Sequence, residues 1–344
     1  METLFVYVVK KGIAGAMSKK RILSGMRPTG RGTHLGNFVG ALENWVRLQD
    51  EYESYHMVAD WHMLTTDLNH TSDIAENSLR IVIDWLSAGL RPEKSPLFIQ
   101  SHVKEHAELS LIFSMLVTVP RLQRNPTLKE QVKDLGLGRN MSYGHLGYPV
   151  LQASDILIYK ADAVPVGEDQ ASHVEITREI ARRFNHQFGE VFAEPKTLLT
   201  KFARLPGLDG RKMSKSLDNA IFLSDTTEEI LRKVMTAFTD PKKIRKNDPG
   251  NPDGCVVQAY HKRFHPEDAE EVDRECRSGA LGCVAHKKAV AQTLDRFLAP
   301  IRERQAYYES HLDEVRDIIA DGDRRARTTA QATMAEVRET MHMG

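Results

Sequence analysis

The sequence has little cysteine, no net charge and no long apolar run. Only three of its 344 residues are cysteines, too few for the disulfide framework of a secreted protein, so we expect a reducing compartment and place the chain in the cytoplasm. No apolar run approaches the roughly 20 residues that a membrane-spanning helix needs, so no membrane partner is expected. Lys plus Arg and Asp plus Glu number 47 each, so any polyanionic partner must bind a local basic patch.

A phosphate-binding loop of the form G-x-x-x-x-G-K-[ST] is also missing. What is present in the first half is an alternation of short apolar runs with helical periods. This order indicates an α/β fold, a Rossmann-like doubly wound parallel sheet covered by helices on both sides. The runs expected to be strands are 21–25, 55–60, 97–101 and 163–166.

After about residue 220 the apolar residues keep helical spacing throughout, which predicts an all-α C-terminal domain. Within it, 312–320 and 323–340 are expected to be separate helices. A length of 344 residues fits about two domains. The predicted division is an N-terminal extension at 1–17, a Rossmann-type catalytic domain at 18–219 and an α-helical domain at 220–344.

Polar residues stand out in three stretches, two at predicted junctions of strand and helix and one, 147–159, on a predicted helix. In SGMRPTGRGTHLGN (24–37), glycines and a helix start suit a phosphate, and His34 can donate to it, although a glycine-rich turn gives the same pattern. In GYPVLQASDILIY (147–159), Asp155 stands among apolar residues and needs a salt bridge or a ligand as partner. In VPVGEDQASH (164–173), acid and amide groups follow a strand end, where open α/β sheets bind ligands.

A fourth stretch, GRKMSKSLDN at 210–219, is basic and rich in hydroxyls. Lys212 and Lys215 flank Met213 and Ser214. Two ammonium groups on a loop can neutralise the charge that develops on a polyphosphate leaving group. A charged run is more often a solvated loop, so this stretch gains weight only together with the others.

Together these stretches resemble a known family. KMSKS at 212–216 and HLGN at 34–37 resemble the two signatures of class I aminoacyl-tRNA synthetases. With GMRPTG, LQASDI and VPVGEDQ in the same order, the chain resembles the bacterial type of tryptophanyl-tRNA synthetases over about residues 21–340. The resemblance implies an enzyme that uses ATP and Mg²⁺ to convert L-tryptophan into tryptophanyl-adenylate and then transfers the amino acid to tRNA(Trp).

The resemblance also implies which residues form the site. The expected catalytic residues are His34, Lys212, Ser214 and Lys215. The residues expected to bind ATP are Arg27, Pro28, Thr29, Gly36, Asn37, Gly167, Glu168, Asp169, Leu205, Lys212, Met213, Ser214, Lys215 and Ser216. The residues expected to hold the α-amino group of tryptophan are Tyr148, Gln152 and Gln170.

The choice between tryptophan and tyrosine depends on the polar groups around the ring. An indole offers one N–H donor and no acceptor, whereas a phenol both donates and accepts. The resemblance places a tyrosine on the first strand of tyrosine enzymes, and Leu23 stands there in this chain. Asp155 then remains as the single acceptor, which favours tryptophan. His62 either faces this pocket near the substrate carboxylate or is a core histidine.

Two departures from the family pattern keep other functions open. TGRGTHLGN is one residue longer before His34 than usual, and Gln152 replaces a methionine found in many bacterial tryptophan enzymes. The alternatives are a tyrosine–tRNA ligase, which Leu23 opposes, a small-molecule adenylyltransferase, which the long helical half opposes, and a regulatory paralogue that binds tryptophan and ATP, which the intact KMSKS opposes.

The three cysteines fall in the predicted helical domain. Cys255, Cys276, Cys283 and His286 form the pattern C-x20-C-x6-C-x2-H, similar to a four-cysteine iron–sulfur pattern of some tryptophanyl-tRNA synthetases. Three thiolates and an imidazole suit Zn²⁺ or a cluster with one histidine ligand. Cysteines that pack between helices without a metal are the alternative, and spacing alone does not decide between them.

By resemblance, the helical domain would read the anticodon, and the protein would be a homodimer with tRNA bound across it. For each basic candidate a solvated surface is the alternative role. The basic candidates are Lys242, Lys243, Arg245, Lys246, Arg324, Arg325 and Arg327.

Overall fold

The computed structural model describes residues 19–69, 71–167, 171–199 and 205–343, with the side chains of Arg139 and Ser216 left out. The predicted extension at 1–17 lies outside the described residues. Within the described residues, no helix has both the length and the apolar character that crossing a membrane requires.

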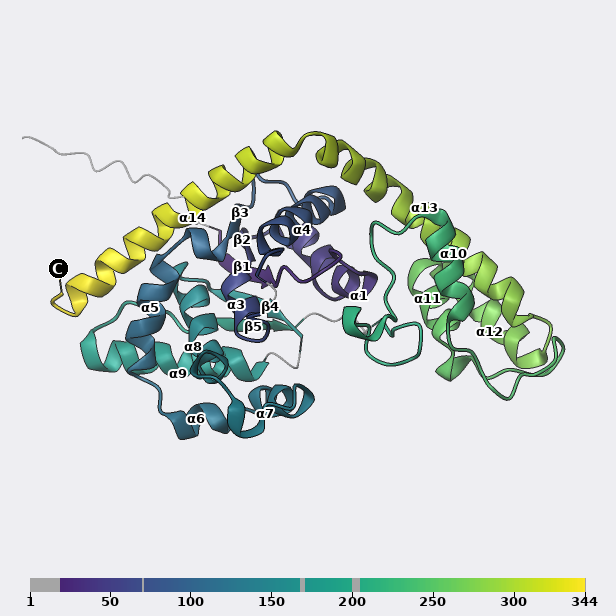
Figure 1. Cartoon of the computed structure of the whole chain (residues 1–344), viewed down its shortest axis with the longest axis horizontal. Coiled ribbons are helices and arrows are strands. Elements are labelled where there is room, and N and C mark those ends of the chain that lie inside the picture. Colours follow the sequence, from purple (N-terminus) through teal and green to yellow (C-terminus); the bar gives the residue numbers. More distant parts are fainter. Residues whose placement is uncertain (1–18, 70, 168–170, 200–204, 344) are drawn as a thin grey trace, which may run out of the picture.

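The sheet has five parallel strands in the order β3-β2-β1-β4-β5 (Figure 1). The strands are β1 Arg21–Met26, β2 Glu53–Val58, β3 Leu97–Ile99, β4 Ala163–Val166 and β5 Lys196–Leu199. The first four confirm the predicted strands and the doubly wound parallel fold. β5 was not predicted, because this short edge strand has exposed ends and carries no buried apolar run.

Helices cover both faces of the sheet. Those of the α/β part are α1 Leu35–Asn37, η1 Phe38–Leu42, α2 Glu43–Leu48, α3 Asp60–Leu64, α4 Ile74–Ala88, η2 Gln100–His102, α5 Glu105–Ser114, α6 Val119–Gln123, α7 Pro126–Asp134, η3 Gly138–Asn140, α8 Tyr143–Ile158 and α9 Ala171–Phe188. β2 shows the two-sided burial, since Tyr55 and Met57 belong to one apolar cluster and Val58 to the other.

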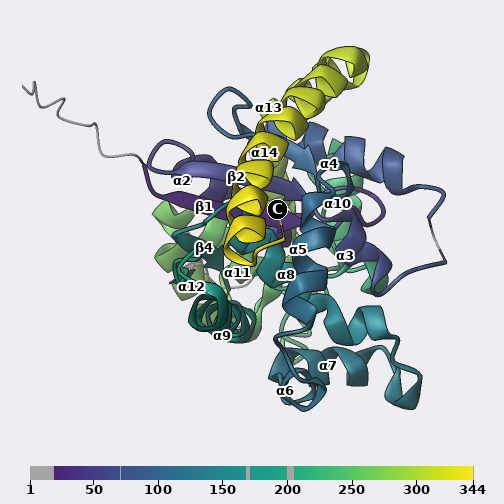
Figure 2. The same cartoon turned by 90° about the vertical axis from the view of Figure 1, so that its left-hand side faces the viewer.

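The chain after β5 is helical apart from isolated bridges in its described residues. Its elements are η5 Lys215–Leu217, α10 Thr227–Thr236, η6 Pro252–Gly254, α11 Val256–Phe264, η7 Pro266–Asp268, α12 Ala269–Ser278, α13 Cys283–Ser310 and α14 Leu312–Thr340. The long α13 leads back from the helical part, and α14 returns across the α/β part beside α5 (Figures 1 and 2). The division at residues 219 and 220 stays a prediction.

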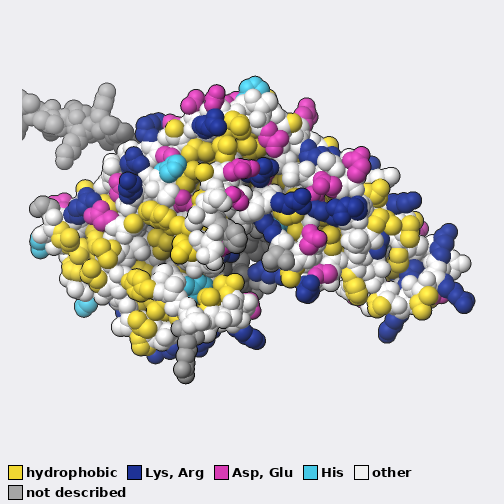
Figure 3. All heavy atoms as spheres, viewed as in Figure 1, with side chains coloured by type: hydrophobic (Ala, Val, Ile, Leu, Met, Phe, Trp, Pro, Cys, Tyr) yellow, Lys and Arg dark blue, Asp and Glu magenta, His cyan; other side chains and the backbone are white. Residues whose placement is uncertain are grey.

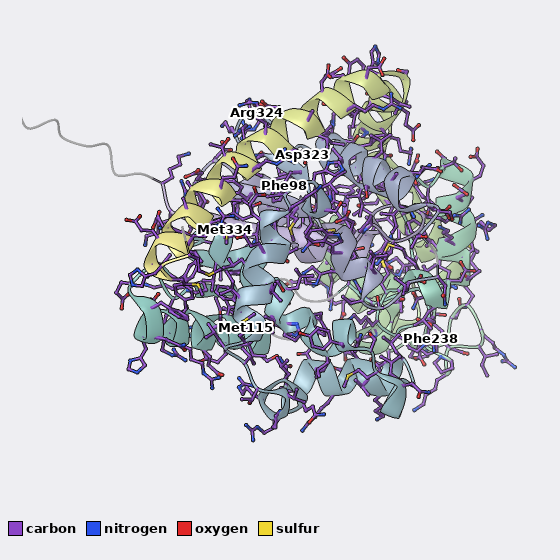
Figure 4. The ribbon with its side chains drawn as sticks, turned by 60° about the vertical axis from the view of Figure 1, so that its left-hand side comes forward. Phe98, Met115, Phe238, Asp323, Arg324 and Met334 are labelled. Carbon is purple, nitrogen blue, oxygen red and sulfur yellow. The ribbon has the colours of Figure 1, made fainter. Side chains whose placement is uncertain are left out.

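α14 is one helix where two were predicted, and it continues through Gly322. A Cβ atom at Gly322 would lie 2.0 Å from the carbonyl oxygen of Leu97, so only glycine lets this helix approach β3 so closely. Beside it, the backbone N–H of Ile99 donates to Asp323 at 3.0 Å. Figure 4 shows Asp323 above Phe98 at this crossing. Tertiary contact thus explains the glycine that stands between the two predicted helices.

Candidate active site

The two predicted signature stretches meet at the end of β1. The backbone N–H of Leu35 donates to the carbonyl of Ile221 at 2.8 Å, and that of Leu223 donates to Thr33 at 3.0 Å. The segment after KMSKS is therefore paired with the segment that carries His34. Met213 adds a side-chain contact, because its sulfur lies 3.1 Å from the backbone nitrogen of Gly36.

His34 is buried and neutral at physiological pH. Burial, together with the positive charge of Lys215, lowers the pKa of His34 to about 4. Its Nδ1 accepts the backbone N–H of Asn37 at 3.1 Å, and its ring meets Phe222 edge to face. A neutral imidazole that accepts at Nδ1 carries its proton on Nε2, which is therefore the nitrogen that can donate to a ligand.

Lys215 is held against the opposite side of the loop. Its Nζ donates to the carbonyl of Thr29 and, at 3.2 Å, to the Thr29 hydroxyl. Burial lowers the pKa of Lys215 to about 8, with the charge of Asp84 opposing the shift and that of Arg27 adding to it. The ammonium is thus present at neutral pH but is less strongly solvated than a surface lysine.

The other residues of the predicted ATP set occupy varied environments. Arg27 donates to the hydroxyl of Thr66 at 3.1 Å, and Lys212 is exposed. The Ser214 backbone N–H donates to Asn219 at 2.8 Å, which ties KMSKS to the turn behind it. Pro28 and Leu205 are buried and Gly167 is partly buried. Glu168, Asp169 and the side chain of Ser216 lie outside what the structure describes.

Asp155 lies on α8, is 1% exposed and accepts from three side chains. Its Oδ2 lies 2.6 Å from Nε2 of His62, and its Oδ1 lies 2.6 Å from Nδ1 of His106 and 2.8 Å from Nε2 of Gln100. Burial alone would raise the pKa of Asp155, but the hydrogen bonds and charges of the two histidines lower it to about 2. Asp155 is therefore an anion at the bottom of the site.

A family comparison settles what these two clusters belong to. A protein-family model described as "tRNA synthetases class I (W and Y)" matches residues 17–299. The chain belongs to this family. It is 49% identical over 326 residues to a tryptophan–tRNA ligase of Thermotoga maritima, covering 94% of this chain and 99% of the relative. It is 43% identical over 394 residues to that of Aquifex aeolicus, covering 94% and 100%.

A solved structure gives the same result in three dimensions. The tryptophanyl-tRNA synthetase of Campylobacter jejuni, crystallised with ADP and tryptophan, superposes with a TM-score of 0.83 at 30% identity and covers 94% of this chain and 99% of that one. The predicted family membership and Rossmann-like fold are thus confirmed for this class I synthetase.

Among the remaining residues predicted for tryptophan, the described ones lie on β1 and on α8, the helix that carries Asp155. Leu23 is buried in β1, in the apolar cluster that also contains Ile156 of α8. Tyr148 is buried, and its hydroxyl lies 2.7 Å from Nε2 of His173. Gln152 is partly buried on α8. Gln170 lies outside the described residues.

The sequence analysis did not predict three residues of the cluster around Asp155, which are Gln100, His106 and Tyr159. Gln100 and His106 bind Asp155 directly, and His106 Nε2 lies 2.8 Å from the hydroxyl of Tyr159. One signal was available, because Gln100 follows the third strand, and residues at the carboxyl ends of strands commonly bind ligands in such sheets. His106 gave no comparable signal in the sequence.

The predicted metal residues are brought to one place in the helical part. Cys255, Cys276, Cys283 and His286 line a common pocket, and all three cysteines are free thiols. Nε2 of His286 lies 3.1 Å from Nδ1 of His261, so its Nδ1 is the nitrogen left for a ligand. The donor set suits a thiophilic metal; whether it binds one stays a prediction.

Proposed function

We infer that this synthetase is a tryptophan–tRNA ligase. It activates L-tryptophan with ATP to tryptophanyl-adenylate and transfers the amino acid to tRNA(Trp). The observation that carries this inference is the Asp155 cluster, which keeps one anionic acceptor in a buried site next to an apolar first strand. The tryptophan enzymes among the relatives support it.

The chemistry requires positioning and charge stabilisation by the protein's own groups. The tryptophan carboxylate attacks the α-phosphorus of ATP, a new O–P bond forms, and the bond to the β-phosphate oxygen breaks to release pyrophosphate. Lys215, Lys212 and the Nε2–H of His34 would hold the phosphate oxygens, and Mg²⁺ would accompany them. Lys215 exchanges its contact with Thr29 for a phosphate oxygen when ATP binds.

The choice of tryptophan follows from the count of hydrogen bonds at Asp155. A carboxylate offers about four acceptor positions, and three are taken by His62, His106 and Gln100. The remaining position suits the single N–H of an indole. A tyrosine hydroxyl could donate there as well, but its oxygen would face the buried Leu23 without a donor, which leaves it half satisfied.

The experiment that tests this function is ATP–pyrophosphate exchange with tryptophan, tyrosine and no amino acid, followed by aminoacylation of tRNA. Exchange with tryptophan only, together with charging of tRNA(Trp), is expected. Equal exchange with tyrosine would contradict the assignment of Asp155 and Leu23. Exchange without charging would instead favour a paralogue that forms the adenylate for another purpose.

For tRNA, we propose that the anticodon is read by the helical part, where Lys and Arg side chains are frequent (Figure 3). Lys242, Arg245 and Lys246 are exposed in the loop after α10 and remain the best candidates. Arg325 is less suitable, because it donates to the carbonyl of Pro92 at 2.6 Å and so ties α14 to the α/β part. Affinity for tRNA should fall with salt as phosphate contacts require. We place this reaction in the cytoplasm.

We also propose a homodimer. Leu111 on α5, Met115 directly after α5 and Val119 at the start of α6 are 61%, 74% and 49% exposed. Figure 4 shows Met115 at the end of α5, away from α14. Three large apolar side chains exposed together indicate an interaction surface. A second copy of the chain is the partner that the family resemblance implies.

Finally, we propose that Cys255, Cys276, Cys283 and His286 hold Zn²⁺ or an iron–sulfur cluster. Burial raises the pKa of Cys255, which disfavours its thiolate in the absence of a positive ion. A bound metal would remove this penalty and fix α11, α12 and α13 to one another. The group would act on the structure of the helical part and lies apart from the adenylate chemistry.

A further inference from the structure

The loop before His34 follows an unusual backbone path. Gly30 and Gly32 have φ angles of +55° and +91°, values that side chains rarely allow. The N–H of Gly32 donates to the carbonyl of Gly30 at 2.8 Å, so the loop makes a tight turn here. Such a turn requires a fixed contact at its far end if His34 is to keep one position.

Asp84 of α4 supplies that contact. Its Oδ2 accepts the backbone N–H of Thr33 at 2.5 Å, directly before His34. A Cβ atom at Gly32 would lie 2.7 Å from the same oxygen, so the glycine lets the loop come close enough for this bond. Asp84 is 3% exposed, and a buried carboxylate without ligands of its own needs such donors.

The other oxygen of Asp84 is held from the helical half of the chain. Gln305 of α13, itself 5% exposed, donates from Nε2 to Oδ1 at 2.7 Å. The neighbouring Arg304 donates to the carbonyl of Ser87 at 2.6 Å, so α13 is fixed to the last turns of α4. Gln305 of α13 thus orients Asp84, and Asp84 in turn holds the loop through the backbone of Thr33. Its negative charge also acts on Lys215 from the far side of the loop.

We propose that Asp84, oriented by Gln305, is a positioning residue that fixes the loop before His34 and thereby the binding of the ATP phosphates. The proposal rests on the proposed function of His34 and Lys215. Asp84 contacts neither substrate directly in this scheme. Its effect is transmitted through the backbone of Thr33, so it should alter the use of ATP and leave the pocket around Asp155 unchanged.

The test compares two substitutions at one position. Asp84→Leu keeps the number and branching of the side-chain heavy atoms but removes both acceptors, so the loop loses its anchor. Asp84→Asn keeps an acceptor for Thr33, and Gln305 can rotate its amide to accept from the new NH₂ group. We expect Asp84→Leu to raise the KM for ATP about tenfold or more while the KM for tryptophan stays within about twofold. Asp84→Asn should restore the KM for ATP to within about threefold of the wild type.

Two further variants keep the result interpretable. Ser78→Ala removes a side chain of α4 that is 1% exposed and bonds only within its own helix, so it should leave both KM values unchanged. Gln305→Leu should raise the KM for ATP in the same direction as Asp84→Leu, and it carries the test if Asp84→Leu does not fold. KM does not depend on the fraction of protein that is active, which separates positioning from loss of folded enzyme.

A purely structural role for Asp84 would lower the unfolding temperature in Asp84→Leu and leave the KM for ATP unchanged, and this result would overturn the proposal. Equal rises in both KM values would overturn it too. Direct titration of ATP onto the wild type and Asp84→Leu by calorimetry distinguishes the two inferences. If the wild type binds ATP more tightly than the variant but shows no exchange with tryptophan, the proposed function fails and the role of Asp84 stands.

Discussion

Asp155→Asn tests the centre of the proposed tryptophan site with a change of few atoms. The asparagine oxygen can replace Oδ1, which accepts from His106 and Gln100, and its NH₂ group then stands where Oδ2 was. A neutral His62 can accept from that NH₂ group at Nε2 by taking the other tautomer. The protein's own hydrogen bonds can therefore be remade, whereas the indole N–H of the substrate now faces a donor.

The expected loss is the hydrogen bond between the indole and a charged acceptor. Such bonds contribute about 1.5–3 kcal/mol, so kcat/KM for tryptophan in pyrophosphate exchange should fall roughly 10- to 150-fold. A tryptophan analogue with sulfur in place of the indole N–H has no such bond to lose. Wild type should prefer tryptophan to this analogue by a similar factor, and Asp155→Asn should use the two almost equally.

The comparison between the two substrates is what makes the experiment decisive. If Asp155→Asn loses the same factor with tryptophan and with the sulfur analogue, the residue supports the fold of the site and does not read the indole. An unchanged kcat/KM for tryptophan would contradict the proposed site more strongly, because the indole would then bind away from Asp155 and α8. The KM for ATP serves as the internal control and should stay within about twofold.

Four further predictions concern separate parts of the molecule. Because the pKa of Lys215 is about 8, its charge is complete below that pH, and kcat/KM for ATP should fall as pH rises through about 8; a flat profile to pH 9 would exclude the lysine as the phosphate ligand. Gly322→Ala should lower the unfolding temperature by several degrees since its Cβ meets a carbonyl, whereas Gly40→Ala, with open space around its Cβ, should not. Protein purified without oxygen should contain zinc or iron that Cys276→Ser loses, and metal-free wild type would refute the metal site. Met115→Asp should shift a dimer towards monomer in sedimentation, with Leu135→Asp, also at an exposed site, as control.

How much of the fold the sequence predicted depends on how local each signal is. β1 to β4 were predicted because their apolar runs are buried on both faces of the sheet, a pattern visible in any one strand. β5 was missed, because backbone pairing to β4 holds it in the sheet and none of its side chains is buried. Two helices at 312–320 and 323–340 were predicted in place of α14, since nothing near Gly322 in the sequence reveals its contact with Leu97, which is 225 residues away in the chain.

In the candidate site too, the residues in local sequence motifs were predicted and their partners from distant elements were not. His34, Lys215 and Asp155 were predicted, because each belongs to a stretch of neighbouring residues that resembles a family signature. Their partners come from other elements, and a partner such as His106 has no signature of its own. These partners are recognised only in the structure, where the segment after β3 and helix α5 place Gln100 and His106 against Asp155 of α8.

Asp84 and Asp155 show why residue type alone could not separate the two roles. Both are carboxylates on helices and both are nearly fully buried. At Asp84 burial outweighs the neutral donors and raises the pKa to about 6, so its contribution to stability is complete below about pH 4 and is lost as pH rises to 6.

At Asp155 the two histidines outweigh burial, so its contribution is complete above about pH 4 and is lost as pH falls towards 2. A carboxylate held as an anion at every physiological pH can accept an indole N–H without waiting for a proton to leave. Asp84 does not need a permanent charge in the same way, because its proposed partner, the backbone N–H of Thr33, stays with it through every catalytic cycle. In the proposed function, the histidines around Asp155 would therefore contribute to the recognition of tryptophan by keeping this carboxylate charged.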